Sequence, residues 1–396
     1  MAQPARGVRA GHRHPDIPIA SDTDTHALVN VLVVNAGSST LKLALVGGDD
    51  QMLVARELEA PETGIDADTL RAALAEGLSE AEVVGHRIVH GGERFREAVR
   101  VDEDVQGALE ELVDLAPLHQ AKSIAALAAV STALPAVPAV ACFDTAFHHS
   151  MSQAAVTYPI PVEWRERWHV RRYGFHGLSH AWIARRAPEL LGVPAAGLRL
   201  VSCHLGAGAS LCAILDGRSV DTTMGFTPLE GVVMATRSGS IDPGAMLWLL
   251  ARKGMSEREL ANALEHRSGL FALAGTADMR EVLDLAQRGD PNARLALAVY
   301  KHRLRAWIAA MAASLGGLDA VAFTGGIGQR SPEIRAEAAV GMEFLGLAID
   351  PQRNSEGTGD REITATGARV RTLVIEARED LEIARQARAV LHAAAL

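Results

Sequence analysis

Short apolar runs that end at turns of small residues recur along this chain, and they predict its β-strands. The run 31–34 leads into a turn at 35–40 and a second run at 41–46. The run 198–203 leads in the same way into a turn at 204–210 and a run at 211–217. Each set is typical of a β-hairpin, and because the two sets look alike they predict two related halves of the molecule.

The remaining patterns alternate between expected strands and expected helices. Strands are predicted at 81–90, 138–143, 319–323 and 371–375, and helices at roughly 103–116, 121–134, 290–315 and 379–393. A polar capping residue followed by proline predicts helix starts at Asp242, Asp290 and Ser331. This order of elements predicts an α/β fold whose strands are mostly buried.

The length of the chain predicts two domains, because 396 residues exceed what one ordinary core supports. We expect an N-terminal domain at 28–150 and a C-terminal domain at 151–379. The last helix, within 380–396, is expected to pack back on the first domain, since chain termini often lie close together. Residues 1–27 lack the apolar core of a secretory signal and are interpreted as a disordered leader or an over-extended start.

Composition and charge exclude several classes of protein. Hydrophobic residues make up 48% and charged residues 22%, which is typical of a globular protein. Lysine plus arginine is 39 against 48 acids, a net charge of −9 that argues against a nucleic-acid partner. No apolar stretch reaches the roughly 18 residues of a membrane span. The three cysteines lie inside apolar runs, so we expect buried thiols in a reducing cytoplasm.

The glycine turns and the polar residues at strand ends point to phosphate chemistry. Glycine turns at 35–40, 204–208 and 324–328 let backbone N–H groups approach an anion closely. Polar side chains gather at the expected strand ends, where α/β folds collect their ligands. They are Asn35, Lys42, Arg87, Asp144, His176 and Arg237. Two arginines, a lysine, a histidine and an acid are what phosphoryl transfer requires, because charge on the migrating group must be neutralised.

Each of these residues alone has an ordinary structural interpretation. Arg87 could be half of an ion pair in a strand. His86 and His90 lie four apart, but on a strand without the interior Glu of zinc-protease spacing, which argues against a zinc site. Apolar residues at strand and loop ends could belong to the core or to a substrate pocket.

Eight blocks of sequence carry a family resemblance. They lie at 35–42, 85–93, 116–119, 143–148, 172–177, 224–231, 235–239 and 323–328. In this order they resemble the signature blocks of the acetate kinase (acetokinase) family, and the match runs from about 29 to 390. The resemblance implies the duplicated two-domain fold of actin, sugar kinases and Hsp70 (ribonuclease H-like). It also implies an ATP-dependent kinase of short-chain carboxylates, acetate and possibly propionate, that uses Mg²⁺ or Mn²⁺ and forms a homodimer.

The resemblance also implies roles for individual residues. Asn35 and Glu379 would contact the metal. The catalytic residues would be Arg87, Asp144, His176 and Arg237. The substrate would meet Arg87 and a small apolar pocket made of Val89, Leu118, Phe175 and Pro228. The nucleotide would contact Lys42, His204, Leu205, Gly206, Ala207, Gly208, Asp278, Met279, Arg280, Gly326, Ile327, Gly328, Gln329 and Arg330.

One implied role conflicts with elementary chemistry. A carboxylic acid with a pKa near 4 is already ionised at pH 7, so it has no proton for a general base to remove. We therefore expect Asp144 to act mainly by ordering magnesium and bound water. Alignment and charge neutralisation would lower the barrier.

The chain departs from the family pattern mostly in the nucleotide half. Ala207 stands where the family has Asn, Gln329-Arg330 where it has Glu-Asn, and Gln120-Ala121 where it has Asn-Pro. In the last block, residues 377–380 are Ala-Arg-Glu-Asp. Losing one hydrogen bond to a charged group costs about 1.5–3 kcal/mol, so activity could fall without vanishing. One hypothesis is that Arg330 changes the preferred phosphoryl donor.

Two other interpretations stay open from the sequence. The turn at 324–328 between a strand and a helix, with Asp350 some twenty residues on, mimics a dinucleotide-binding fingerprint. A relative that binds nucleotide or acyl phosphate without turnover is the second. The residues do not tell acetate from a longer acid, since one methylene changes binding by only about 1–3 kcal/mol. They also do not tell in which direction the reaction runs in the cell.

Overall fold

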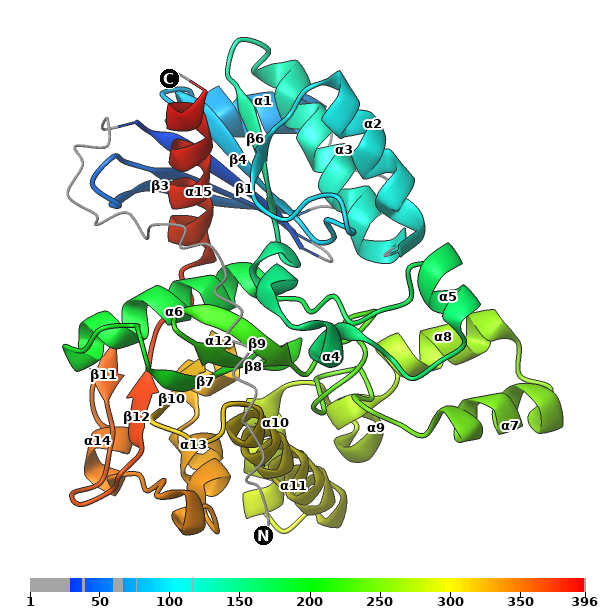
Figure 1. The fold of residues 1–396 in the computed structure, drawn as a ribbon, viewed down its shortest axis with the longest axis vertical. Helices are drawn as coiled ribbons and strands as arrows, with labels where there is room; N and C mark the ends of the chain where they lie inside the picture. Colours follow the sequence, from blue (N-terminus) through cyan, green and yellow to red (C-terminus); the bar gives the residue numbers. More distant parts are fainter. Residues whose placement is uncertain (1–28, 38–39, 60–66, 76, 116, 395–396) are drawn as a thin grey trace, which may run out of the picture.

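The computed structural model describes residues 29–37, 40–59, 67–75, 77–115 and 117–394, and the leader at 1–27 lies outside them. In this part of the chain the strands form two six-stranded sheets, one in each of two lobes stacked along the long axis (Figure 1). The first sheet contains β1 (Val31–Ala36), β2 (Thr40–Val46), β3 (Met52–Glu59), β4 (Val83–Ile88), β5 (Val99–Arg100) and β6 (Ala139–Phe143). The second contains β7 (Arg199–Leu205), β8 (Ala209–Leu215), β9 (Arg218–Thr222), β10 (Ala320–Thr324), β11 (Arg361–Glu362) and β12 (Arg371–Val374).

The two sheets share one topology, which confirms the predicted duplication. The first has the order β3-β2-β1-β4-β6-β5, and the second has the order β9-β8-β7-β10-β12-β11 when it is read from its other edge. In each sheet an antiparallel meander leads into two parallel strands, and a short antiparallel strand closes the edge. The expected hairpins at 31–46 and 198–217 are the first two strands of each meander.

Helices cover both faces of each sheet. The first lobe carries α1 (Ala67–Ala75), α2 (Glu103–Glu111), the 3₁₀ turn η1 (Leu112–Leu115) and α3 (Pro117–Ala133). The rest of the chain forms η2 (Ala146–Ser150), α4 (Gln153–Val156), α5 (Val162–Arg167), α6 (Gly177–Leu191), α7 (Pro243–Lys253), α8 (Glu257–His266), α9 (Gly269–Ala274), α10 (Met279–Gln287), α11 (Pro291–Ser314), α12 (Gly325–Arg330), α13 (Pro332–Ala339), η3 (Glu343–Leu345), α14 (Pro351–Ser355) and α15 (Glu379–Ala393).

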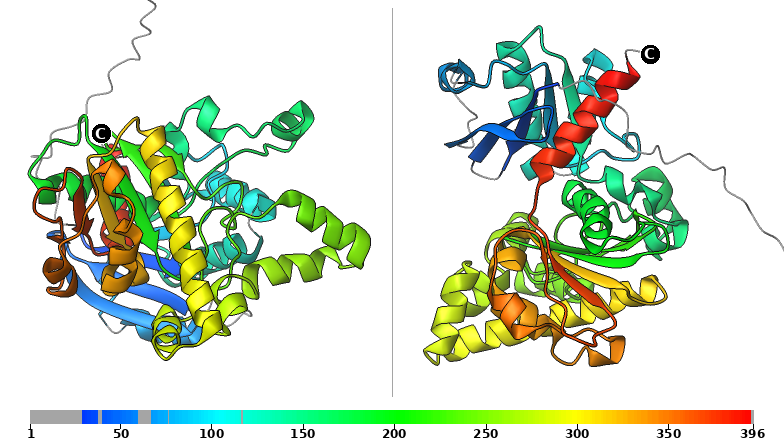
Figure 2. Two further views of the ribbon diagram at one scale, coloured as in Figure 1. Left: turned by 90° about the horizontal axis from the view of Figure 1, so that it is seen from below. Right: turned by 90° about the vertical axis from the view of Figure 1, so that its left-hand side faces the viewer.

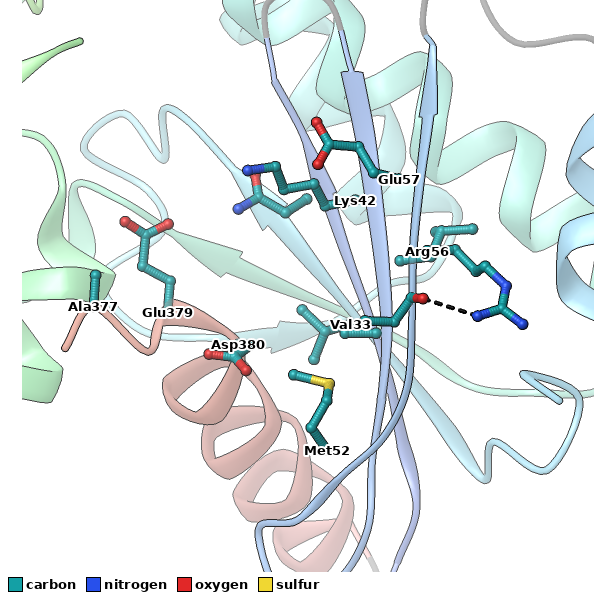
Figure 3. Close-up of a pocket in the computed structure, with 12 residues that line it drawn as sticks. Val33, Lys42, Met52, Arg56, Glu57, Ala377, Glu379 and Asp380 are labelled. Carbon is teal, nitrogen blue, oxygen red and sulfur yellow. Dashed lines mark hydrogen bonds between the residues drawn. The ribbon is translucent and has the colours of Figure 1, made fainter. Parts of the chain in front are cut away.

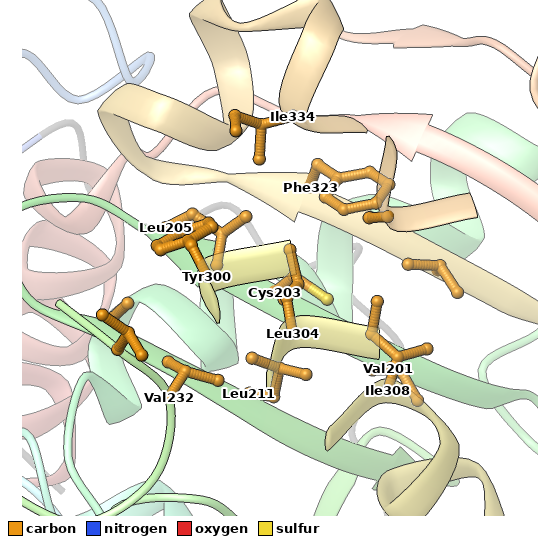
Figure 4. Close-up of a cluster of buried hydrophobic side chains, with 14 of the residues drawn as sticks. Val201, Cys203, Leu205, Leu211, Val232, Tyr300, Leu304, Ile308, Phe323 and Ile334 are labelled. Carbon is orange, nitrogen blue, oxygen red and sulfur yellow. The ribbon is translucent and has the colours of Figure 1, made fainter. Parts of the chain in front are cut away.

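The alternation of side chains along β1 explains why its apolar run is continuous. Val31 and Val33 pack against α15, whereas Leu32 and Val34 face the layer of α1 and α3. A strand buried on both faces has no polar side, so it lacks the apolar–polar alternation of a half-exposed strand. The second sheet repeats the arrangement. Val201 and Cys203 pack against α11 (Figure 4). Leu200 packs against α6 on the other face.

The last helix returns from the second lobe and packs on the first sheet (Figure 2, right). Leu381, Ile383, Ala384 and Ala387 of α15 are buried with residues of β1, β4 and β6. The approach is closest at Gly85 of β4, where a Cβ would stand 2.6 Å from Cγ2 of Ile383. Glycine is required there because any side chain would push the helix off the sheet.

The helix at 117–133 begins earlier than the pattern predicted. The structure continues from α2 through η1 and restarts at Pro117, whereas the sequence pattern predicted helices at 103–116 and 121–134. Proline suits a first helical position, because the N–H it lacks has no partner inside the helix there.

We predict that Gly85→Ala destabilises the first lobe by about 1–3 kcal/mol, since the added methyl group overpacks the interface between β4 and α15. The measurement is urea unfolding followed by circular dichroism.

Gly107→Ala is the matched control for the same change in size. Gly107 lies inside α2, and a Cβ there would have no neighbour within 4 Å. This variant should gain about 0.5–1 kcal/mol from helix propensity. Equal effects of the two substitutions would show that α15 does not need close contact at Gly85.

Candidate active site

A buried ion pair lies where the parallel strands of the first sheet end. Arg87 is the penultimate residue of β4, and Asp144 follows β6, the neighbouring parallel strand. Asp144 Oδ2 accepts hydrogen bonds from Arg87 Nη2 at 2.6 Å and Nε at 3.2 Å. Asn35, at the end of β1, accepts from Arg87 Nη1 through its Oδ1 at 3.1 Å. Three expected site residues therefore meet at one edge of the sheet.

In this cluster, carboxylate oxygens of Asp144 and Glu379 remain available to bind another group. Asp144 is 1% exposed, and its Oδ1 has no hydrogen-bond partner. Glu379, the first residue of α15, has Oε2 3.9 Å from Arg87 Nε. Burial raises the pKa of Asp144 above its ordinary value, and Glu379 adds to the rise while the Arg87 charge opposes it. Two carboxylates thus share one guanidinium.

His176 reaches the site from the second lobe in a left-handed backbone conformation, with φ 56° and ψ 26°. It precedes α6, whose first N–H, from Gly177, donates to the Asp144 carbonyl at 2.9 Å. A Cβ at Gly177 would stand 2.1 Å from that carbonyl oxygen, so only glycine lets the helix start here. The unusual backbone of His176 follows from this close approach.

His176 and Arg237 converge on the glycine turn between β7 and β8. A Cβ at Gly208 would lie 3.3 Å from His176 Nε2 and 3.5 Å from Arg237 Nη1. The imidazole and the guanidinium therefore face the backbone of the turn directly. A side chain at Gly208 would fill the space that they address.

The imidazoles around His176 are neutral at pH 7. His176 stacks on His204, with ring centroids 4.4 Å apart, and burial together with neighbouring cationic groups holds its pKa well below 6.5. Burial lowers the pKa of His204 to about 4, an effect that Arg87 increases. His148 also has a pKa lowered to about 4, mainly by burial. In this setting a histidine serves as a hydrogen-bonding group without charge.

A cavity of about 950 Å³ opens beside the glycine turns of the second lobe. Most of the residues expected at the nucleotide line it: Gly206, Ala207, Gly208, Asp278, Met279, Arg280, Gly326, Ile327 and Arg330. Arg237 lines it as well. The α12 helix starts at this cavity, and Gly325, with φ +75°, lies against the Leu205 backbone. The cavity is of the size that holds drug-sized ligands.

Other expected nucleotide residues lie elsewhere. The side chains of His204 and Leu205 do not line this cavity, since His204 lies under His176 and Leu205 is buried in the core. Gln329 lines a neighbouring cavity of about 370 Å³ that shares Arg330. Lys42 lines a separate cavity of about 530 Å³ in the first lobe, together with Asn35 and Glu379 (Figure 3).

The expected acyl pocket is placed in part. Val89 and Phe175 are buried in one cluster, and the carbonyl of Pro228 accepts a hydrogen bond from Arg237 Nη1 at 3.4 Å. Leu118 lies in α3, but its side chain is outside the described residues. Of these residues, Pro228 borders the Arg237 guanidinium.

The oxygen ligands around Arg87 suit a magnesium ion better than a transition metal. No group of three or more His, Cys, Asp or Glu side chains arranged for a metal occurs in the described ranges. The unpartnered Asp144 Oδ1, the Glu379 carboxylate and the Asn35 amide oxygen are hard oxygen donors. Mg²⁺ typically takes one or two carboxylates and fills its remaining positions with phosphate and water.

Sequence reasoning missed the residues that support the histidines. Ser210 hydrogen-bonds His176, Ser179 bonds His204, and His180 lies behind them. Two signals were present in the sequence: His176 and His180 lie four apart at a helix start, and Ser202, His204 and Ser210 interrupt apolar strand runs. Neither signal reveals partners on a different element.

We predict that acid weakens the fold through these histidines. A buried neutral His with a folded pKa of about 4 and an unfolded pKa of 6.5 contributes full stability above pH 6.5 and loses it as the pH falls toward 4. Between pH 7.5 and 5.0 the loss is about 2 kcal/mol per residue. His204→Gln and His148→Gln should each reduce the fall in unfolding free energy over that interval by about this amount, measured by urea titration.

His302→Gln, which removes an exposed imidazole of α11, is the control. If the pH dependence of the two buried-site variants matched that of the control, the imidazoles would not be held neutral in the folded state.

Comparisons with known proteins show the family of this chain. The model of the acetokinase family matches residues 54–385. Acetate kinase of Acetivibrio thermocellus is 41% identical over 391 residues, covering 90% of this chain and 98% of the relative. Acetate kinase of Leifsonia xyli is 45% identical over 387 residues, covering 90% and 98%.

Solved structures show the same fold. A propionate kinase from Francisella tularensis superposes with a TM-score of 0.86 at 34% identity, covering 91% of this chain and all of the other. Acetate kinase from Porphyromonas gingivalis gives a TM-score of 0.84 at 31% identity, covering 92% and 100%. The dinucleotide interpretation of the turn at 324–328 is therefore wrong, since that turn belongs to the second of two duplicated sheets. The chain is a member of the acetokinase family.

Proposed function

We propose that this protein catalyses the reversible phosphorylation of acetate by ATP, giving acetyl phosphate and ADP, and that propionate also serves. The names of its relatives support the reaction, and one observation on this chain carries it. Arg237 and a neutral His176 face a glycine turn that opens into a large cavity, and the Arg87 charge acts on both of them. Cations, donors and backbone amides are the groups that stabilise a migrating phosphoryl group.

The mechanism follows from the charge of each group. Acetate arrives ionised, so its oxygen attacks the terminal phosphorus without losing a proton. The two guanidinium groups hold the carboxylate and the phosphoryl oxygens in line, and they offset the repulsion between two anions. His176 donates a hydrogen bond through Nε2, the nitrogen nearest the glycine turn. ADP leaves in the cavity beside α12.

The apolar residues expected at the acyl pocket would receive the alkyl end of the acid. Val89, Phe175 and Pro228 offer a small apolar surface, and this suits a methyl or ethyl group. Propionate would differ from acetate by one methylene, worth about 1–3 kcal/mol in such a pocket.

We propose Asn35, Glu379 and Asp144 as the residues that hold a Mg²⁺ ion, directly or through water. The ion would neutralise charge on the nucleotide phosphates. Asp144 needs no role as a base, and its second oxygen remains available because Arg87 occupies only Oδ2. Lys42, exposed in the neighbouring cavity, would approach the phosphates if the two lobes close.

The alternative of a relative without turnover is not favoured, nor is an altered donor. The substitutions at 207, 329 and 330 leave the large cavity and both glycine turns in place. Arg330, exposed at the cavity, adds a cation rather than removing one.

We predict that Arg87→Ala lowers acetyl phosphate formation at least 100-fold, because a charged donor to the reacting groups is lost. The assay is hydroxamate formation from acetate or propionate with ATP and Mg²⁺. Arg94→Ala, which removes an exposed arginine paired with Asp104, should stay within twofold of the unmodified protein. Turnover that survives Arg87→Ala would reject the proposed mechanism.

We propose that the protein forms a homodimer through a surface of α5 and α7. Exposed apolar side chains gather on these two helices and the segments next to them: Val162, Trp164, Trp168, Ile241, Leu247 and Trp248. Both helices project from the same side of the molecule (Figure 1), and α7 has no buried residues. Aromatic residues exposed in this number are typical of a protein interface.

Trp248→Glu should convert the dimer to a monomer of 42.0 kDa, because a charge replaces an apolar contact. Light scattering after size exclusion measures the mass. Phe344→Glu, which changes an exposed aromatic residue of η3, is the matched control and should leave the mass unchanged. If the unmodified protein has the mass of a monomer in solution, the proposed interface is refuted.

We also propose a cytoplasmic location. The three free cysteines are buried in the sheets, as expected of thiols that never form disulfides. None of the helices that the structure describes has the length and apolarity to cross a bilayer.

A further inference from the structure

A chain of hydrogen bonds leads from His176 into the core of the second lobe. His176 Nδ1 lies 2.9 Å from Ser210 Oγ, which lies 2.8 Å from His180 Nε2. His180 Nδ1 in turn lies 2.9 Å from Ser202 Oγ. Ser202, Ser210 and His180 are fully buried, so water cannot replace any of these bonds. The four residues come from β7, β8 and the start of α6.

Among the described residues, Ser210 Oγ has no acceptor besides the two imidazoles, so its hydroxyl donates to one of them and the protons along the chain can run in only two directions. In the first, each hydroxyl donates toward His176: Ser202 to His180, and Ser210 to His176, with His180 Nε2–H donating to Ser210. In the second, every donor and acceptor is exchanged. A neutral imidazole carries one proton, so the direction of the chain decides which nitrogen of His176 is protonated.

Ser202 decides between the two directions. In the first direction its hydroxyl proton goes to His180 Nδ1. In the second, that nitrogen donates to Ser202, and the hydroxyl proton needs another acceptor. The described residues offer Ser202 Oγ no partner besides His180. A buried hydroxyl without an acceptor is costly, so the first direction is favoured.

We propose that Ser202, His180 and Ser210 are positioning residues that hold His176 with its proton on Nε2. That nitrogen faces the turn at Gly208 and the Arg237 guanidinium. His176 is thereby fixed as an uncharged hydrogen-bond donor toward the migrating phosphoryl group. The catalytic consequence rests on the proposed function, whereas the protonation pattern does not.

Burial supports the neutral state that the proposal needs. The pKa of His176 and that of His180 are both lowered well below 6.5, first by burial and then by neighbouring groups. The groups that face His176 are His204, Arg87, His180 and Arg237. A second proton on the ring would lie near the Arg87 and Arg237 cations, so it is disfavoured at pH 7.

A second histidine nearby provides an internal comparison. His148 has a serine at the same distance, with Ser219 Oγ 2.9 Å from Nδ1, but its Nε2 lies 3.0 Å from the carbonyl of Phe175. A carbonyl only accepts, so His148 carries its proton on Nε2 whether Ser219 is present or not. Ser219 is therefore a matched control for Ser210, because it offers the same bond without setting a tautomer.

The direct test is NMR of the full chain labelled with ¹⁵N-histidine at pH 7.5. Long-range ¹H–¹⁵N correlations distinguish the two tautomers, and spectra of His176→Gln and His180→Gln assign the two rings. We expect both rings to be protonated on Nε2 and bare on Nδ1. A proton on Nδ1 of either ring overturns the proposal, whatever the enzymatic activity.

Kinetics with the variants tests the catalytic consequence. Ser210→Ala and Ser202→Ala should convert the single His176 tautomer into a mixture, although Ser202 lies two bonds further along the chain. For Ser210→Ala we expect kcat to fall roughly tenfold with the KM for acetate within twofold, since donor alignment rather than binding is lost. Ser219→Ala should leave the tautomer of His176 unchanged in the NMR spectrum. Its kcat should stay within twofold of that of the unmodified protein.

The outcomes separate the two claims. Unchanged His176 spectra and unchanged kcat in both Ser210→Ala and Ser202→Ala would refute the positioning role. If Ser210→Ala does not fold, Ser202→Ala and the spectrum of the unmodified protein still decide the tautomer. Absence of acetyl phosphate formation by the unmodified protein would reject the proposed function, while the NMR result would stand by itself.

Discussion

Asp144 makes hydrogen bonds to both lobes, and the rest of the site depends on them. Its carboxylate accepts from Arg87 at 2.6 Å, and its carbonyl accepts from the first N–H of α6 at 2.9 Å. One residue thus fixes the guanidinium of the first lobe and the backbone next to His176. Because Asp144 is buried, removing Arg87 would leave its charge uncompensated, which destabilises the protein. The geometry is held by the fold rather than by flexible side chains.

Duplication explains how two lobes supply complementary parts. In each sheet the parallel strands end at one edge, and the hairpin before them supplies a turn at the same edge. The first lobe places Asn35, Arg87 and Asp144 there. The second places His204, the glycine turn and the start of α12 at the equivalent position. The two edges therefore carry different groups, an arginine–carboxylate pair on the first and a glycine turn on the second.

The sequence predicted the buried strands well because their apolar runs are continuous. It missed β3, whose side chains are mostly exposed and include two Glu and one Arg, so burial leaves little mark on its pattern. It also missed α5, which buries no side chain of its own, whereas the predicted helix start at Asp242 is the N-cap of α7. The ion pair of Arg87 and Asp144 joins residues 57 apart, and the serine–histidine chain joins three elements. Such pairings depend on strand register, which no local pattern encodes.

The departures from the family pattern fall where backbone atoms set the geometry. Gln120 stands in place of the usual Asn, yet its amide bonds both the N–H and the carbonyl of His90, each at 3.0 Å, as a neighbouring strand would. Around Ala207 the turn is held by a bond from Gly206 N to Gly208 O and by one from Ala235 N to Ala207 O. Neither bond uses a side chain at 207. A turn closed by its own backbone bonds keeps its shape when one side chain changes. The substitutions in this chain therefore alter the lining of the cavity more than the parts that carry the chemistry.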